Sequence, residues 1–180
     1  MLEDRLLIRR LRRGEKAALR LIYEKYKDHM LTIARNLLFD RTLAEDCLHD
    51  VFVNFAARAA EFRLRSNLKS YLTVSIANRA RDMLRAKSRQ NVSLSTMPNQ
   101  PADPAAPPAQ LIHSEQTVRL YAALAELPFE QRQVIVLHLN AELKFRQIAT
   151  HLSLSINTVQ SRYRYGLDKL RSLLRKGAQA

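Results

Sequence analysis

The sequence predicts an all-α protein made of two small helical domains joined by a linker rich in Pro and Ala. Apolar residues recur at three- and four-residue intervals along most of the chain, which is the period of an amphipathic helix. Only three of the 180 residues are glycine, and few stretches alternate as strands do. Five of the six prolines fall between Pro98 and Pro108, in a stretch that cannot bury a core.

The charge of the chain indicates a polyanionic partner. Lys and Arg number 30 against 17 Asp and Glu, and the formal net charge is +13. No apolar run approaches the roughly 20 residues that a membrane-spanning helix needs. Residues 2–13 are interrupted by charges throughout and do not resemble a signal peptide. The single cysteine, Cys47, excludes an internal disulfide and a thiolate metal cluster, and the expected location is a reducing cytoplasm.

The first domain is expected to span residues 1–90. Four helices are predicted in it, over residues 3–13, 15–38, 43–60 and 68–87. Gly14 separates the first two, and the apolar side of the first carries Leu6, Leu7 and Leu11. Thr42 is the predicted N-cap of the third helix.

Two helices of this domain carry marked charge. The outer face of the third helix is acidic and polar, with Glu45, Asp46, His49, Asp50 and Asn54. Such a stripe is either an ordinary solvated face or a docking surface for a protein partner. The fourth helix is basic, and aromatic residues lie beside it. Flat rings next to cations are what single-stranded nucleic acid needs, although a solvated basic helix would have the same pattern.

The second domain is expected to span residues 113–176, after a linker over residues 91–112. One helix is predicted at about 114–126, with Val118, Tyr121, Ala122, Leu124 and Ala125 facing inward, and Pro128 opens the next. Both domains have an excess of Lys and Arg, so both can contact the same polyanion.

The end of the chain has the pattern of a helix-turn-helix. Phe145, Ile148, Ala149 and Leu152 mark one apolar face of a first short helix. The turn is Ser153-Leu154-Ser155, and Ser155 is the predicted N-cap of the second helix. The apolar side of that helix is predicted to carry Ile156, Val159, Tyr163, Leu167, Leu170 and Leu174. Its other side is polar and basic, which fits a DNA major groove better than a plain helical hairpin.

The order of these parts resembles the bacterial RNA polymerase sigma factors, of the small extracytoplasmic-function type in the sigma-70 superfamily. In the first domain the resemblance is carried by Ala44-Glu45-Asp46, Asp50-Val51-Phe52, Phe62-Arg63, Leu68-Lys69-Ser70-Tyr71-Leu72 and Ile76-Ala77-Asn78-Arg79, which are similar to region 2. In the second it is carried by Leu124-Ala125-Glu126-Leu127-Pro128, Gln131-Arg132, Ile148-Ala149 and Asn157-Thr158-Val159-Gln160-Ser161-Arg162, which are similar to region 4.

The resemblance implies a transcription initiation factor rather than an enzyme. It implies that the first domain binds core RNA polymerase and opens the promoter −10 element, while the second reads the −35 element. The implied partners are core polymerase, promoter DNA as a −35 duplex and a melted −10 strand, and an anti-sigma factor. No cofactor, metal or membrane insertion is expected.

The resemblance also implies three sets of contact residues. Core polymerase would meet Asp46, His49, Asp50 and Asn54. The −10 strand would meet Phe62, Arg63, Ser66, Asn67, Lys69, Tyr71, Asn78 and Arg79. The −35 duplex would meet Thr158, Gln160, Ser161, Arg162, Arg164 and Tyr165. The chain has Tyr71 where the family usually has Trp, Ser153 at a usual turn glycine, and Gln160 at a usual basic position, where Gln favours adenine.

Two other classes of protein account for less of the sequence. A free-standing helix-turn-helix regulator would explain the end of the chain and its charge, but not the acidic third helix or a second basic domain. An enzyme would need a motif that the sequence does not offer. Its five histidines show no metal-ligand spacing, and no phosphate loop or nucleophile motif appears.

Overall fold

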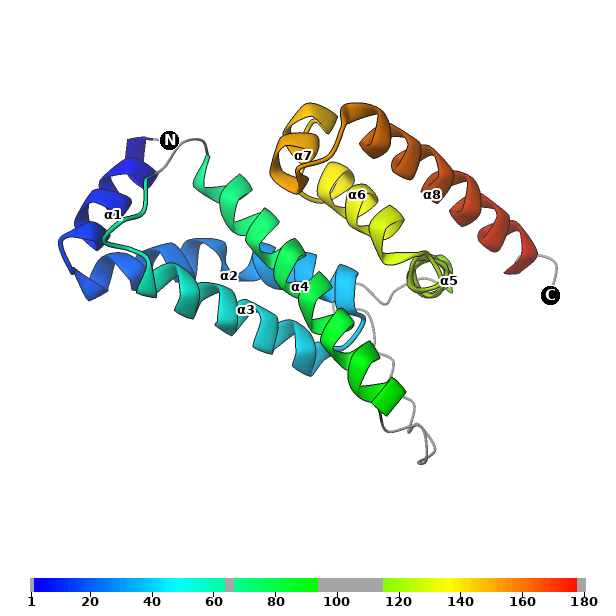
Figure 1. Ribbon diagram of the computed structural model, residues 1–180, viewed down its shortest axis with the longest axis horizontal. Coiled ribbons are helices and arrows are strands. Elements are labelled where there is room, and N and C mark those ends of the chain that lie inside the picture. The colour runs from blue at the N-terminus through cyan, green and yellow to red at the C-terminus, as the bar shows by residue number, and fades with distance from the viewer. Residues whose placement is uncertain (1, 64–66, 94–114, 178–180) are drawn as a thin grey trace.

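The structure is a computed structural model that describes residues 2–63, 67–93 and 115–177. Within these ranges the chain forms eight helices and no strand, as predicted (Figure 1). Helices α1 to α4 form one group, and α5 to α8 form a second group packed beside it. Of the predicted linker, residues 91–112, the first three belong to α4, and the rest lies outside the described residues.

Helix α2 is the centre of the first group and packs against the other three helices. The bounds are Leu2–Arg12 for α1, Lys16–Leu38 for α2, Arg41–Ala57 for α3 and Leu68–Ser93 for α4. Side chains at three- and four-residue spacing on α2 meet those of α4 in the core. The largest fully buried ones are Ile22, Met30, Ile33, Leu37, Leu68, Leu72 and Ile76.

Helix α1 is fixed to α2 by apolar packing and by a buried polar network. Its buried apolar residues are Leu7, Ile8 and Leu11. The prediction that Leu6 lies on the apolar side is wrong, because that side chain is exposed. Spacing of three and four residues selects Ile8 instead, because residues 7, 8 and 11 share one side of a helix.

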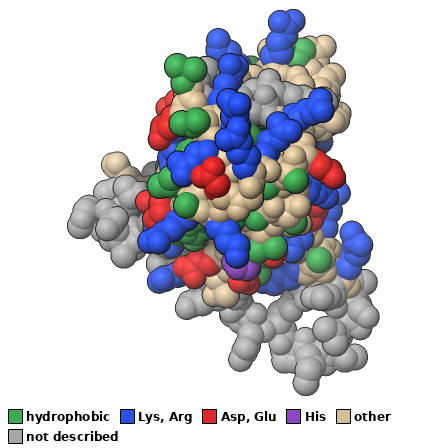
Figure 2. Space-filling model, turned by 90° about the vertical axis from the view of Figure 1, so that its left-hand side faces the viewer, with side chains coloured by type: hydrophobic (Ala, Val, Ile, Leu, Met, Phe, Trp, Pro, Cys, Tyr) green, Lys and Arg blue, Asp and Glu red, His purple; other side chains and the backbone are tan. Residues whose placement is uncertain are grey.

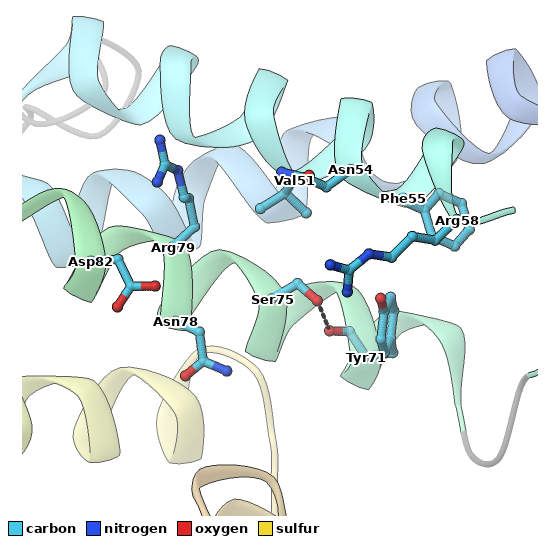
Figure 3. Close-up of a pocket in the computed structure, with 9 residues that line it drawn as sticks. All are labelled: Val51, Asn54, Phe55, Arg58, Tyr71, Ser75, Asn78, Arg79 and Asp82. Carbon is cyan, nitrogen blue, oxygen red and sulfur yellow. Dashed lines mark hydrogen bonds between the residues drawn. The ribbon is translucent and has the colours of Figure 1, made fainter. Parts of the chain in front are cut away.

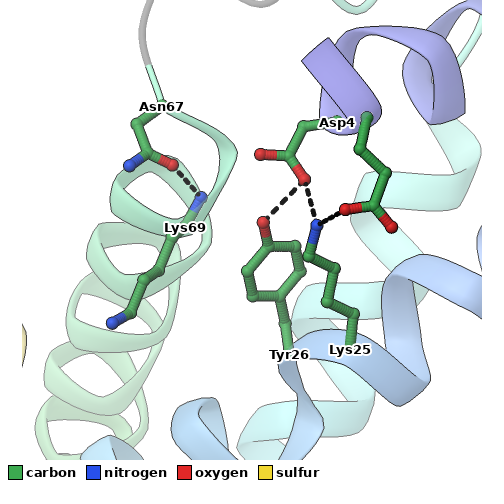
Figure 4. Close-up of polar contacts among 6 residues, drawn as sticks. Asp4, Lys25, Tyr26, Asn67 and Lys69 are labelled. Atoms are coloured by element: carbon green, nitrogen blue, oxygen red, sulfur yellow. Dashed lines mark hydrogen bonds and ion pairs between the residues drawn. The ribbon is translucent and has the colours of Figure 1, made fainter. Parts of the chain in front are cut away.

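The network joins the first turn of α1 to the middle of α2 (Figure 4). The Tyr26 hydroxyl donates to Asp4 Oδ1 at 2.8 Å, and Lys25 Nζ lies 2.9 Å from the same oxygen and 2.6 Å from Glu3 Oε2. Burial, and then the hydrogen bond to Asp4, raise the pKa of Tyr26 to about 12. Burial alone would raise the pKa of Asp4, but the hydrogen bonds from Lys25 and Tyr26 outweigh it and lower that pKa.

The turn between α2 and α3 is shorter than predicted. Phe39 adopts a left-handed conformation (φ 50°) and ends α2, and its backbone N–H donates to Arg35 O. Asp40, and not Thr42, is the N-cap of α3, because its carboxylate accepts the Leu43 N–H at 3.0 Å. Aspartate and threonine are both good N-caps, so the sequence alone does not decide which of the two caps the helix.

In the second group, α8 packs against the other three helices, and α6 is the most deeply buried helix. The bounds are Glu115–Ala125 for α5, Phe129–Leu139 for α6, Phe145–Leu152 for α7 and Ile156–Gly177 for α8. Four successive residues of α6, Val134 to Leu137, are buried, as expected of a helix covered on all sides. Gly166 of α8 lies against α6 so closely that a Cβ there would come within 2.8 Å of Ile135 Cδ1.

Helix α5 does not present the predicted face. Ala123 is its buried residue, whereas Val118, Ala122 and Ala125 are exposed. The apolar residues of this short helix lie on all of its sides, so their spacing does not determine which side faces the core. Arg132 of α6 helps to fix its end, because its guanidinium donates to the carbonyl oxygens of Leu124, Ala125 and Leu127.

The two groups touch through α6, which contacts α2 and α4. Gln133 Nε2 donates to Ala77 O at 3.4 Å, and the Arg132 guanidinium lies 5.0 Å from the centre of the Phe39 ring. Phe39 also meets Tyr121 edge to face. The contact is therefore aromatic and polar rather than ionic, which lets two basic halves lie together.

Candidate nucleic-acid interface

The helix-turn-helix forms where it was predicted. Helix α7 ends at Leu152, and Ser153 takes the left-handed conformation (φ 54°) at its C-cap, the place where glycine is usual. The Thr158 N–H donates to Ser155 Oγ at 3.0 Å, which confirms Ser155 as the cap of α8.

Three aromatic rings that pack together hold α7 and α8 at a fixed angle. His138 stacks on Phe145 at 4.3 Å between ring centres, and Tyr163 meets both rings edge-on at 5.0 and 5.1 Å. His138 Nδ1 lies 2.8 Å from Leu143 O; because a carbonyl oxygen only accepts, Nδ1 carries the proton. Tyr163 is thus a packing residue, and the rings support the presentation of α8.

The exposed side of α8 is broad. At 100° per residue, Ser161 and Arg164 lie near the middle of the face opposite buried Val159 and Gly166. Gln160 and Tyr165 flank them on either side, and Arg162 lies at the border with the buried side. The Arg164 guanidinium carbon lies 5.1 Å from the centre of the Tyr165 ring, so these two side chains already stack on each other. Ile156 was predicted on the apolar side of this helix, and that prediction is wrong because its side chain is exposed.

A groove of about 320 Å³ runs between α3 and α4. Asn54 and Phe55 line it from α3, and Tyr71, Asn78 and Arg79 line it from α4 (Figure 3). Residues predicted for the polymerase and residues predicted for the −10 strand therefore meet in one groove.

An aromatic cluster closes one end of this groove. Tyr71 lies 4.8 Å from Phe62 and 6.2 Å from Phe55, measured between ring centres. Phe62 in turn meets Phe55 edge to face at 5.1 Å. Tyr71 remains partly exposed, so one face of a rigidly packed ring borders the groove.

The acidic stripe of α3 is partly neutralised within the chain. Asp50 Oδ2 accepts both Nη2 and Nε of Arg79, at 2.6 and 2.9 Å. Glu45 pairs with Arg41 at 2.9 Å. Asp46 and His49 are exposed, and neither is paired with any residue that the structure describes. The Asn54 amide donates to Asp50 O, one turn back on the same helix.

The remaining residues predicted for the −10 strand surround the loop before α4. Arg63 and Asn67 are exposed, and Ser66 lies outside the described residues. Asn67 Oδ1 accepts the Lys69 N–H at 2.9 Å and starts α4, which leaves its amide NH₂ as a donor (Figure 4). The Lys69 amine is partly exposed on the first turn.

Five residues that line the groove were in none of the predicted sets: Val51, Phe55, Arg58, Ser75 and Asp82. Arg58 extends from the end of α3 across it toward Tyr71 and Ser75 (Figure 3). The spacing of Arg58 offered a signal, because residues 50, 54 and 58 lie on one strip of a helix. Ser75 gave none: its hydroxyl donates to Tyr71 O, and only the position of α3 reveals that it borders the groove.

The described residues lack the features of other kinds of site. No three His, Cys, Asp or Glu side chains gather there as metal ligands would. No helix among them is long and apolar enough to cross a membrane. Cys47 is buried, and that burial raises the pKa of its thiol to about 12, which makes it a packing residue.

Comparison with protein families gives two matches, in the order of the two helical groups. The family model of Sigma-70 region 2 matches residues 22–90, and that of Sigma-70 region 4 matches residues 117–170. Together the two matches cover well over half of the chain. The first contains α3, the groove and α4 up to residue 90, and the second contains α7 and α8 up to residue 170.

Relatives that match over nearly their whole length agree with these two family matches. RNA polymerase sigma-H factor of Pseudomonas aeruginosa is 25% identical, over 97% of this chain and 97% of its own length. ECF RNA polymerase sigma factor SigW of Bacillus subtilis is 24% identical, over 93% and 95%.

Two solved structures share the fold. The sigma factor RpoE of Bartonella quintana, in complex with the anti-sigma factor NepR, has a TM-score of 0.71 and 23% identity, over 86% of this chain and 96% of that one. CnrH, in complex with the cytosolic domain of CnrY, has a TM-score of 0.70 and 21% identity, over 97% and 98%.

Proposed function

The chain belongs to the sigma-70 family of transcription initiation factors, and on that basis we propose how its parts divide the work. Residues 1–90 bind core RNA polymerase and the −10 element, residues 91–112 link the domains, and residues 113–176 bind the −35 element. The observation that carries this proposal is that an α3–α4 groove and a capped helix-turn-helix occur in one chain, in the order of regions 2 and 4.

Helix α8 is the −35 reader in this proposal. Ser161 and Arg164 point toward the base edges, because they lie nearest the middle of the exposed face, and Gln160 and Tyr165 flank them. Arg162 lies at the border of this face and reaches the wall of the major groove, where phosphates are nearest. Thr158 is held by the Ser155 cap, with the two hydroxyl oxygens 2.8 Å apart, and contributes at the N-terminal end of the helix.

The −10 strand binds along the α3–α4 groove and the loop before α4. Tyr71 offers a fixed ring for an unstacked base, and Phe55 and Phe62 hold that ring in place. Asn78, Asn67, Arg63 and Lys69 supply hydrogen bonds and charge. Extruding a base costs a few kcal/mol of stacking, which these contacts offset.

Asp46 and His49 form the centre of the polymerase-docking surface, because they are the members of the acidic stripe whose side chains are exposed and unpaired within the described chain. Asp50 holds Arg79 in the groove, and so it supports the −10 site as well as the docking surface. Asn54 borders both.

An anti-sigma factor is the third proposed partner. Both solved neighbours are complexes with a second protein, and one of these is called an anti-sigma factor. In this proposal the chain acts in the cytoplasm, catalyses no reaction and needs no cofactor.

Co-elution with sigma-free core RNA polymerase on size exclusion tests the proposal. The wild-type chain should co-elute with core, and Asp46→Lys should not. The control is Asp28→Lys, which reverses the charge of an exposed carboxylate on α2 and should behave as wild type. A wild-type chain that stayed apart from core yet bound duplex DNA would be a free-standing regulator instead.

A further inference from the structure

One strongly basic surface takes no part in the functions assigned above. Arg9, Arg12 and Arg13, at the C-terminal end of α1, line a hollow of about 260 Å³ together with Ala60, just beyond α3. We call this set the α1 arginine cluster. Figure 2 faces the end of the molecule that contains α1, and Lys and Arg side chains project from much of it.

The charge of the α1 arginine cluster is not balanced within the described chain. Neither Arg9, Arg12 nor Arg13 has a described carboxylate within 4.0 Å, although their neighbour Arg10 pairs with Glu15 at 2.7 Å. Cations gathered on one hollow repel one another unless an anion lies between them. The hollow is therefore suited to an anionic group from outside.

The cluster stands on a rigid support. Arg12 Nε donates to Ala60 O at 3.3 Å, which leaves its two terminal nitrogens free. Leu7, Ile8 and Leu11 anchor the inner face of α1. Positions fixed before binding lose less conformational freedom when a ligand arrives.

The cluster also lies next to the surface proposed for the −10 strand. Ala60 precedes Phe62 by two residues, and Arg63 follows at once. Arg58, at the other side of Ala60, reaches into the α3–α4 groove. Exposed arginines therefore run from α1 through the end of α3 to the groove.

We propose that the α1 arginine cluster binds phosphate groups of promoter DNA beside the −10 element. A guanidinium group forks onto phosphate oxygens through two parallel N–H donors. Continuity with the −10 groove favours DNA over the other polyanion available, an acidic protein surface. This inference rests on the proposed function.

The test compares two double variants of the full chain, bound to core polymerase. Arg9→Gln with Arg13→Gln removes two unpaired charges of the cluster. Lys16→Gln with Arg20→Gln removes two exposed charges on the next helix that do not line the hollow. The probe is a fork-junction DNA of mixed sequence, a duplex that ends in a single-stranded tail, and its affinity is measured across a salt series.

The cluster variant should bind this DNA about tenfold more weakly near 0.1 M salt, and the slope of log affinity against log salt should fall by about 1.5, since each phosphate contact contributes roughly 0.7 to 0.9. The control pair should keep the wild-type slope. An unchanged slope in the cluster variant would overturn the inference alone. Weaker binding to core polymerase with unchanged DNA binding would also overturn it, and would assign the cluster to a protein partner. A wild-type chain that fails to bind core would remove the proposed function and this inference together.

Discussion

Arg79 of α4 and Asp50 of α3 form an ion pair in which one carboxylate oxygen accepts two guanidinium nitrogens, at 2.6 and 2.9 Å. The pair joins a residue predicted for the −10 strand to one predicted for the polymerase. Both side chains are about 40% exposed (42% and 38%), so the pair adds little to stability. Its consequence is positional: Asp50 fixes where Arg79 lies in the groove.

Replacing Asp50 is therefore expected to affect two partners, and replacing Asp46 only one. Asp50→Asn frees Arg79 and should weaken both core-polymerase binding and binding of a fork-junction DNA by the holoenzyme. Asp46→Lys should weaken core binding about tenfold or more, because a charge is reversed at a docking surface. DNA binding by holoenzyme assembled at saturating Asp46→Lys chain should be normal. Equal losses in both assays for Asp46→Lys would place Asp46 on the DNA side.

Substitutions on α8 should separate the edge of its exposed face from the middle. Arg162→Gln, at the edge, should weaken binding to all duplexes alike and lower the salt slope by about 0.9, as loss of one phosphate contact does. Arg164→Gln, at the middle, should change which −35 sequences are preferred, since base contacts are worth roughly 1–3 kcal/mol of discrimination. Selection from a randomised −35 duplex measures both. Altered sequence preference in Arg162→Gln alone would reverse the assignment.

Arg132 should be the most sensitive arginine for stability. It is buried, and its guanidinium donates to three carbonyl oxygens at the end of α5. Arg132→Met removes this shared donor, although Leu124 O keeps the Leu127 N–H, and should lower the free energy of unfolding by about 3 kcal/mol. Urea unfolding measures it. The control is Arg119→Met, which breaks an exposed pair with Glu115 and should cost less than about 1 kcal/mol.

Gly166 should tolerate no branched side chain. A Cβ there would lie 2.8 Å from Ile135 Cδ1 and 3.2 Å from Gln131 Cβ, so in Gly166→Val the Ile135 side chain must rotate and α8 must shift slightly from α6. Overpacking of this kind costs about 1–3 kcal/mol, and the shifted helix should also bind −35 DNA more weakly. Lys169→Val, at an exposed position of the same helix, should cost only about 0.7 kcal/mol in helix propensity. Similar thermal midpoints for the two variants would contradict the close packing.

His29 should make the fold less stable in mild acid. Burial, and then the nearby charge of Lys69, lower the pKa of this imidazole in the folded chain, and its Nε2 has no hydrogen-bond partner among the described groups. The unfolded chain therefore takes up the proton first, so stability is highest above about pH 6.5 and falls as the pH drops through the lowered pKa. His29→Gln should flatten this dependence in urea unfolding between about pH 7.5 and 5. The exposed His49→Gln should leave it unchanged; an unaltered curve in His29→Gln would exclude His29 as the cause.

Local signals predicted the helices well and their rotation less well. The helix-turn-helix formed as predicted because Ser155 caps α8 and the apolar spacing of α7 is strict. The face of α5 was wrong because a short helix with apolar residues all round is oriented by what packs on it. Thr42 failed as a cap because Asp40, two residues earlier, could do the same chemistry.

The candidate site was predictable as a list of residues but not as an arrangement. Asp50 and Arg79 lie 29 positions apart, and nothing local indicates that one holds the other. The place of Arg58 in the groove could not be predicted either, because only the approach of α3 to α4 turns its exposed side chain toward Tyr71. Contacts between distant helices depend on packing angles, which helical periodicity does not fix.

If this chain directs RNA polymerase to promoters, transcription should begin at defined start sites in its presence. Sigma-free core polymerase is supplied with fragmented genomic DNA of the source organism, with and without the chain, and the 5′ ends of the transcripts are sequenced. Discrete start sites, preceded by shared −35 and −10 sequences, are expected only when the chain is present, and they should be lost with Asp46→Lys. Start sites that are the same with and without the chain would mean that it does not direct initiation.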